Sequence, residues 1–147
     1  MPHQPKDPDF EKRVRTSFAS QQVMQLIGAR MTGVEPGIVE IEIDARHDLT
    51  QQNGYVHAGI VTTILDSACG YAAYTLMPLD SGVLSVEFKV NLLAPAKGEL
   101  IKARAEVKRA GRTLTVCSAD AIAIDSDKET LCATMLATIM CVDTKRS

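Results

Sequence analysis

The segment His57–Met77 places apolar residues on nearly every face of an α-helix. Such a helix must be buried by other elements. Two segments after it, 84–92 and 101–108, alternate apolar with polar residues, the period of a half-buried strand. Two more apolar segments follow at 114–124 and 131–142, and the second of these is typical of a strand covered on both faces. Because the connections are short, neighbouring strands are expected to pair antiparallel.

Shorter elements are predicted before the long helix. Apolar residues recur every four positions over 10–18, which predicts a short amphipathic helix. A second short helix is expected over Gln21–Ile27, with Ser20 as its N-cap and Gly28 as its stop. Alternating residues over 39–44 predict a further strand, paired with the segment just before it.

One long helix set against a run of strands predicts an α+β fold. The simplest assembly wraps one curved antiparallel sheet of about six strands around the long helix. With 147 residues the chain is expected to form a single domain over 10–147. Residues 1–9 hold three of the six prolines and are predicted to be a flexible tail.

Composition excludes several classes of protein. The chain is 46% hydrophobic and 23% charged, which is typical of a globular protein rather than a disordered one. Its net charge of −2 argues against nucleic-acid binding. Neither a membrane span nor a secretory signal is predicted. The G-x-G-x-x-G, P-loop and G-x-S-x-G patterns are absent from the sequence, so nucleotide-binding and α/β-hydrolase folds are not expected.

The four cysteines lie in apolar or alternating segments and include no C-x-x-C pair; they are Cys69, Cys117, Cys132 and Cys141. This pattern predicts reduced, mostly buried thiols in a cytoplasmic protein. A zinc site or a catalytic thiol is the alternative. No metal site and no cofactor are predicted.

Asp66 is the strongest catalytic candidate. Between residues 49 and 79 it is the only charged side chain apart from His57. Burying an ionised carboxylate without a partner is costly, and the residues four positions away, Thr62 and Gly70, are not basic. The functional interpretation is a general base or nucleophile at a partly dry site. The alternative is an aspartate at a subunit edge that binds water or a backbone group.

The start of the long helix is a second candidate. Free backbone N–H groups near His57 and Gly59 would stabilise a developing oxyanion, although His57 could equally be a capping residue. From His57 to Asp66 a helix rises by about 13–14 Å, and the two side chains point to opposite faces. If both ends act on one carbonyl, Asp66 must come from a second subunit. The sequence therefore predicts an active site across a dimer interface.

Five polar positions outside this helix complete the candidate set from the residues alone. Gln51 and Asn53 precede the helix, where an amide could hold a carbonyl or a water; a polar turn is the alternative. Ser85 lies on the polar face of its predicted strand and could orient a water or Asp66; a strand serine without a role is the alternative. Arg109 and Arg112 lie in a basic hairpin that could bind phosphates, the alternative being a solvated strand face.

The run Gln51–Gly59, QQNGYVHAG, with Asp66 nine residues after His57, resembles the signature of hotdog-fold acyl-CoA thioesterases of the PaaI type. The later runs 85–96 and 108–114 resemble the strand and hairpin that follow in that family. The resemblance implies a hotdog fold and a homodimer, often a dimer of dimers. It also implies two active sites per dimer, each combining the helix start of one subunit with the aspartate of the other.

By position, the resemblance implies a catalytic role for five residues. Asp66 would be the general base or nucleophile, and the backbone N–H at Gly59 would polarise the thioester carbonyl. His57 would shape the loop, and Ser85 would hold the attacking water. Gln51 stands where many relatives carry an asparagine that positions the nucleophile or the leaving thiolate, and its side chain is one methylene longer.

The resemblance also concerns the thiol carrier. Arg109 and Arg112 would lie near the nucleotide end of coenzyme A, with Asn53 as a further contact to the carrier. Coenzyme A belongs to the substrate, so no cofactor is implied. Ala58 replaces the glycine that is commoner in this motif but still offers its backbone N–H. The alternative function is a non-catalytic hotdog module that binds acyl-CoA.

Overall fold

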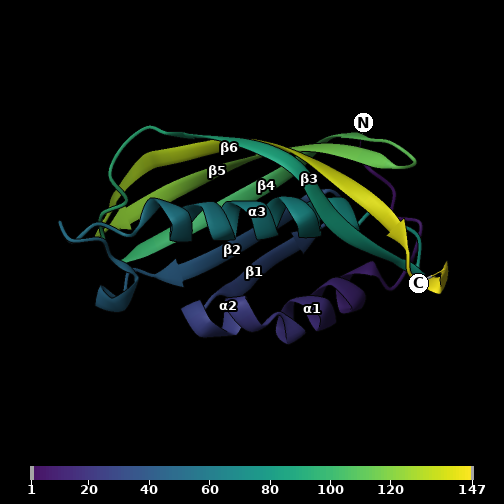
Figure 1. Ribbon diagram of the computed structural model, residues 1–147, viewed down its shortest axis with the longest axis horizontal. Helices are drawn as coiled ribbons and strands as arrows, with labels where there is room; N and C mark the ends of the chain where they lie inside the picture. The colour runs from purple at the N-terminus through teal and green to yellow at the C-terminus, as the bar shows by residue number, and fades with distance from the viewer. Residues whose placement is uncertain (1, 147) are drawn as a thin grey trace.

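A six-stranded antiparallel sheet forms the body of the protein, in the order β1-β2-β4-β5-β6-β3 (Figure 1). The computed structural model describes residues 2–146. The strands are β1 (Arg30–Glu35), β2 (Ile38–Asp44), β3 (Ser81–Leu92), β4 (Leu100–Ala110), β5 (Leu114–Asp125) and β6 (Lys128–Asp143). The helices are α1 (Phe10–Ser20), α2 (Gln22–Ile27) and α3 (Ala58–Tyr74), with short 3-10 turns at His47–Leu49 and Thr144–Arg146. The predicted α+β fold with about six strands is confirmed.

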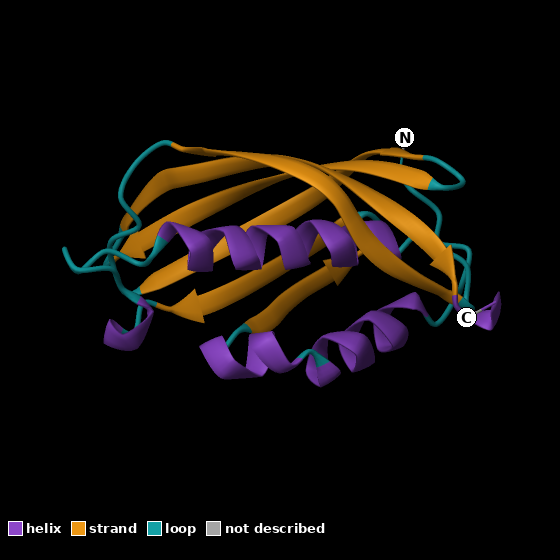
Figure 2. Cartoon of the chain, in the orientation of Figure 1, coloured by secondary structure: helices purple, strands orange, loops and turns teal. Residues whose placement is uncertain are grey.

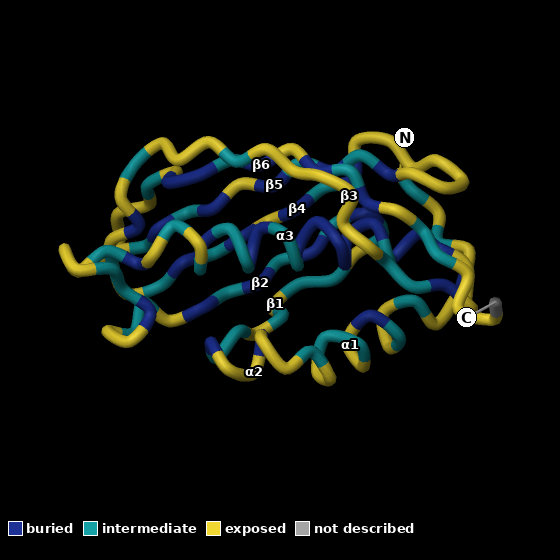
Figure 3. Tube along the Cα trace, viewed as in Figure 1, coloured by how far each residue is buried: buried dark blue, intermediate teal, exposed yellow. Residues whose placement is uncertain are grey.

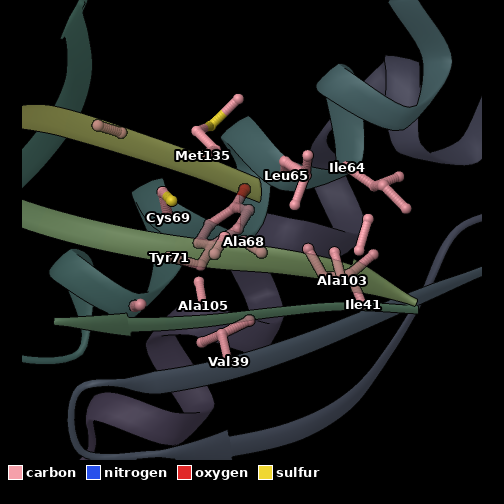
Figure 4. Packing of buried hydrophobic residues seen from close by; sticks show 14 of the residues in the cluster. Val39, Ile41, Ile64, Leu65, Ala68, Cys69, Tyr71, Ala103, Ala105 and Met135 are labelled. Atoms are coloured by element: carbon pink, nitrogen blue, oxygen red, sulfur yellow. The ribbon is translucent and has the colours of Figure 1, made fainter. Parts of the chain in front are cut away.

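The long helix α3 lies in the concave face of the sheet, and α1 and α2 run beside it (Figure 2). On its sheet-facing side Ile64, Leu65 and Ala68 are fully buried. They pack over inward alanines of β4, Ala103 and Ala105, which are also fully buried (Figure 4). Small side chains on the strands let the helix approach the sheet closely, so the sheet buries the predicted apolar helix.

The outer face of the sheet divides into two halves. Over β1, β2 and β4 it is charged and paired, as where Lys102 Nζ lies 3.4 Å from Glu40 Oε2. Over β5, β6 and β3 it carries an apolar patch, in which Met140 stands between Leu84 and Leu114 in the strand register. The residues of this outer apolar patch that are exposed are Leu84, Leu114, Leu136 and Met140. In Figure 3 the edge strand β3 is exposed along most of its length.

Two predicted helix boundaries are wrong. The N-cap of α2 is Gln21, whereas Ser20 is the last residue of α1 and donates its hydroxyl back to the Ser17 carbonyl at 2.8 Å. The long helix ends at Tyr74 instead of continuing to Met77. Gly28, the predicted stop of α2, is confirmed and adopts a left-handed conformation with φ of 72°.

Part of the segment expected to be a flexible tail contacts the fold. The Asp7 carboxylate is only 7% exposed and lies 3.1 Å from Arg13 Nε. The ring Nε2 of His3 lies 3.3 Å from the Val107 carbonyl oxygen on β4. Through these contacts residues 3 and 7 lie near the C-terminal end of α3.

Candidate active site

Asp66 and Ser85 meet where α3 faces the edge strand β3. The Ser85 hydroxyl donates to Asp66 Oδ1 at 2.6 Å. Asp66 itself is half-buried. Among residues 2–146 no hydrogen bond or ion pair reaches Asp66 Oδ2. One carboxylate oxygen is therefore fixed by the serine, and the other is available to a water or a substrate.

A β-bulge puts Ser85 on the helix side of β3. Ser85 pairs with Ile139, but the next pair in the register is Glu87 with Thr138, so Val86 is the extra residue. Ile139 is fully buried on the inner face, and partners in an antiparallel pair share a face. The expected alternation, with Ser85 on the polar face, is therefore wrong for this residue. The bulge turns its hydroxyl toward Asp66.

A groove of about 420 Å³ opens beside this pair. Asp66 and Gly70 of α3 lie along it, β3 contributes Ser85, and α1 contributes Ser17. Its lining combines polar side chains with apolar ones such as Val83 and Leu84. The carboxylate therefore faces a space in which a substrate could be held.

The first turn of α3 is capped by its own histidine. His57 is the N-cap, and its Nδ1 accepts the Gly59 N–H at 2.8 Å. His57 is therefore a capping residue, which was one of its two predicted roles. Since Gly59 already donates to the imidazole, an oxyanion could use this N–H only after the ring moves aside.

Gln51 organises the loop before α3. Its side-chain Oε1 accepts the backbone N–H of Asn53 at 2.6 Å and of Tyr55 at 3.2 Å. Gln51 and His57 line a second cavity of about 530 Å³ at the N-terminal end of α3. Asn53 is exposed at the tip of the loop. This second cavity is separate from the groove that holds Asp66.

The two predicted hairpin arginines lie at the opposite end of the molecule. Arg112 lines a cavity with Met77 and Pro78, just beyond the C-terminal end of α3. Arg109 is exposed near the end of β4. Because α3 has 17 residues, its two ends are about 25 Å apart. One chain therefore does not bring these arginines to Asn53.

Comparison with known proteins gives the family. A model of the thioesterase superfamily matches residues 53–130, which include all of α3 with Asp66, and Ser85. A protein of Saccharolobus solfataricus named as a candidate esterase is 30% identical over 125 residues, 85% of this chain and 81% of that protein. The chain belongs to the thioesterase superfamily.

Solved structures agree with this assignment. The crystal structure of a thioesterase family protein from Silicibacter pomeroyi is similar with TM-score 0.90 and 52% identity, covering 91% of this chain and 98% of that one. The PaaI protein of E. coli, from the phenylacetic acid degradation operon, is similar with TM-score 0.82. Its identity of 12%, over 91% of this chain and 94% of that one, supports the fold alone. This thioesterase superfamily member has the hotdog fold.

The cysteines of this superfamily member are free thiols, as predicted. Three are buried and Cys141 is half-buried. Burial raises the pKa of Cys117 to about 12, and burial, then the neighbouring Cys117 and Asp66, raise the pKa of the Cys69 thiol. These two thiols stay neutral at physiological pH, which makes them poor nucleophiles.

Within residues 2–146 there is no group of three or more histidine, cysteine, aspartate or glutamate side chains that could hold a metal ion. No helix in the same range is long and apolar enough to cross a membrane.

Sequence reasoning missed the part of the groove supplied by the N-terminal helices. Ser17 and Gln21 both line it, and each hydrogen-bonds a residue of α3. A serine on a short amphipathic helix and a glutamine just after it carry no pattern that separates them from solvent-facing residues. Only the packing of α1 and α2 beside α3 brings them to Asp66.

Proposed function

We propose that this superfamily member is an acyl-CoA thioesterase, which hydrolyses a thioester to a free acid and coenzyme A. The observation that carries the proposal is the Ser85–Asp66 hydrogen bond of 2.6 Å inside a groove. A half-buried carboxylate with one oxygen fixed and the other open suits a base that takes a proton from water. The same carboxylate oxygen could instead attack the carbonyl carbon.

The site is proposed to be completed by a second subunit. Within residues 2–146 strand β3 pairs only with β6 and leaves its other edge open, while Val86, Phe88 and Leu92 are 43–58% exposed. An open edge with exposed apolar side chains favours pairing with another strand. Pairing β3 with its copy around a twofold axis would run the two α3 helices antiparallel. The α3 N-terminus of one subunit would then approach Asp66 of the other.

In the general-base form of the reaction, Asp66 removes a proton from water, and the hydroxide oxygen bonds to the thioester carbonyl carbon. The carbonyl oxygen gains the negative charge of the tetrahedral intermediate. Backbone N–H groups at Ala58 and Gly59 of the partner subunit would stabilise this charge once His57 releases Gly59. The intermediate collapses with cleavage of the C–S bond, and the thiolate of coenzyme A takes up the proton.

In the nucleophilic form, Asp66 forms a mixed anhydride with the acyl group and expels the thiolate. Water then hydrolyses the anhydride and regenerates the carboxylate. In both forms Ser85 holds Asp66 Oδ1, which leaves Oδ2 to take the proton from water in the first form and to attack the carbonyl carbon in the second. Transfer of oxygen from labelled water into Asp66 during a single turnover would establish the nucleophilic form, with water attacking the aspartyl carbon of the anhydride.

Coenzyme A is proposed to lie across the two subunits. Antiparallel α3 helices would bring the loop with Asn53 in one subunit toward the hairpin with Arg109 and Arg112 in the other. Guanidinium groups suit the phosphates of the nucleotide. The acyl group could be carried by acyl carrier protein instead, and comparison of the two carriers would decide between them.

A dimer of dimers is proposed to form through the outer apolar patch. The exposed Leu114, Leu136 and Met140 lie together over β5 and β6, and a second dimer would cover them. Free thiols and a coenzyme A substrate are consistent with a cytoplasmic enzyme.

The test is thiol release from acyl-CoA esters of short, medium and long aliphatic acids and of phenylacetic and hydroxybenzoic acids. Asp66→Asn should lower kcat by about 10²- to 10⁴-fold without changing the fold. The matched control is Asp120→Asn, because Asp120 also accepts a hydroxyl hydrogen bond, from Thr134 at 2.7 Å, but on the outer face. Full activity of a folded Asp66→Asn protein would refute the catalytic role.

A binding module is the second candidate function. The observation in its favour is that the Gly59 N–H already donates to His57 Nδ1, so the first turn of α3 is satisfied without a substrate. Stoichiometric binding of acyl-CoA by calorimetry with no thiol release from any ester would establish this alternative.

A further inference from the structure

The groove beside Asp66 continues along one face of α3. Asp66, Gly70 and Tyr74 are spaced by four residues, so they lie in one row along the helix. Strand β3 forms one side of the groove, and Ser17 of α1 together with Gln21, which joins α1 to α2, forms the other. The row extends toward the C-terminal end of α3, away from the His57 cavity.

Gly70 leaves room in the floor of this groove. A Cβ built at Gly70 would come no closer than 4.0 Å to Val83 Cγ2 and would meet nothing else within that distance. The glycine is therefore not required by tight packing. Its effect is to keep the middle of the groove open.

The wall on the α1–α2 side is built from hydrogen-bonded polar pairs. Nearest Asp66, the Ser67 hydroxyl donates to Gln21 Oε1 at 3.0 Å. One helical turn further, Ser17 Oγ and the Tyr71 hydroxyl lie 3.2 Å apart. Tyr71 is only 4% exposed, and burial raises the pKa of its phenol, so it remains protonated.

These pairs do not use all their hydrogen-bonding capacity. The two hydroxyls of Ser17 and Tyr71 carry two protons, and their mutual bond uses one. The amide nitrogen of Gln21 donates to no atom of residues 2–146. Covering such groups with an alkyl chain would leave donors unpaired, which is unfavourable.

We propose that this wall selects acyl groups with a hydrogen-bonding substituent at their far end, such as a hydroxyl, over unsubstituted alkyl groups. Ser17 and Tyr71 are the residues that determine this specificity. The inference rests on the proposed thioesterase activity at Asp66. From Asp66 to Tyr71 the helix rises about 7–8 Å, roughly the length of a six-carbon acyl chain.

The experiment compares hexanoyl-CoA with 6-hydroxyhexanoyl-CoA, which differ only in the terminal hydroxyl. Wild type should hydrolyse the hydroxylated ester with kcat/KM about two- to tenfold higher, the value of one neutral hydrogen bond. Ser17→Ala and Tyr71→Phe should each remove this preference, mainly through KM for the hydroxylated ester. The control Ser20→Ala removes a hydroxyl from the same helix outside the groove and should keep the preference.

Each outcome is decisive. Thermal melting checks the fold of every variant, and if Tyr71→Phe does not fold, the half-buried Ser17 carries the test alone. Hydrolysis of both esters at equal kcat/KM by wild type, or a preference that survives Ser17→Ala, would overturn this inference and leave the thioesterase proposal intact. Hydrolysis of neither ester, together with none of the wider panel, would overturn both.

Discussion

The Arg13 side chain is predicted to be a principal support for the end of α3. Its guanidinium donates to the carbonyls of Pro78 at 2.8 Å, Met77 at 2.9 Å and Tyr74 at 3.2 Å. It also lies 4.3 Å from the centre of the Tyr74 ring. Arg13 Nε is 3.1 Å from Asp7 Oδ2, an ion pair whose angle is not that of a hydrogen bond.

The size of the effect follows from burial. The Arg13 and Asp7 side chains are 12% and 7% exposed, so neither charge is well solvated. Removing one member of a buried ion pair costs about 3–5 kcal/mol, because the other charge stays buried alone. Since both groups keep some contact with water, Arg13→Met should lower the free energy of unfolding by about 3 kcal/mol, the low end of that range.

The assay is urea denaturation followed by circular dichroism, at one fixed protein concentration so that association affects every variant equally. Arg15→Met is the control, because Arg15 pairs with Glu11 at 3.1 Å while both are about half exposed; its loss should be under about 1 kcal/mol. Adding Asp7→Asn to Arg13→Met should recover part of the loss by removing the stranded charge. Equal losses from Arg13→Met and Arg15→Met would refute this reasoning.

Four further predictions concern the groove, the sheet edge and the thiols. Ser85→Ala should lower kcat less than Asp66→Asn does, about tenfold, because the carboxylate remains but loses its orienting hydrogen bond; steady-state kinetics measures this. Gly70→Ala should raise the free energy of unfolding by about 0.5–1 kcal/mol, since alanine favours helix and nothing blocks its Cβ, and a drop in melting temperature would contradict this. Phe88→Glu on the open edge of β3 should yield monomers by light scattering and abolish thiol release, whereas an active monomer would rule out a shared site. At pH 8 a thiol reagent should modify Cys141 in the native protein and all four cysteines in urea. Burial raises the pKa of Cys117 to about 12, so the stability contributed by its neutral thiol is complete below the ordinary pKa of 9.0 and is lost as the pH rises toward 12.

Much of the fold could be predicted because its strands have clear periodicity. On β4 the predicted inward residues Ile101, Ala103, Ala105 and Val107 are all buried. The position of the edge strand β3 in the sequence was also predicted, but the faces to which its side chains point were not. Its apolar side chains Leu84 and Phe88 alternate in the sequence, yet Leu84 pairs with outward Met140 and Phe88 with inward Ala137. After a one-residue bulge each side chain points to the opposite face of the sheet from the one expected, and the amino-acid sequence does not show where the bulge occurs.

The candidate site was predicted in part. An isolated carboxylate in an apolar helix identified Asp66, because burial of such a charge needs a reason. The argument from helix rise also separated it from His57, and the two residues do line different cavities. The capping bond from Gly59 to His57 was one of two open alternatives that only coordinates could separate. Arg109 and Arg112 were expected at a substrate-binding surface, which a single chain does not assemble with Asn53.

The sequence by itself determined the buried helix, the order of the strands along the chain and the singular position of Asp66. Those properties depend on local periodicity and on the cost of placing a charge among apolar residues. The tertiary structure decided which side chains meet Asp66: Ser85 through a bulge, and Ser17 and Gln21 through the packing of two short helices. Such meetings join residues 19 to 49 positions apart in the chain, and they are set by register and packing rather than by any local pattern.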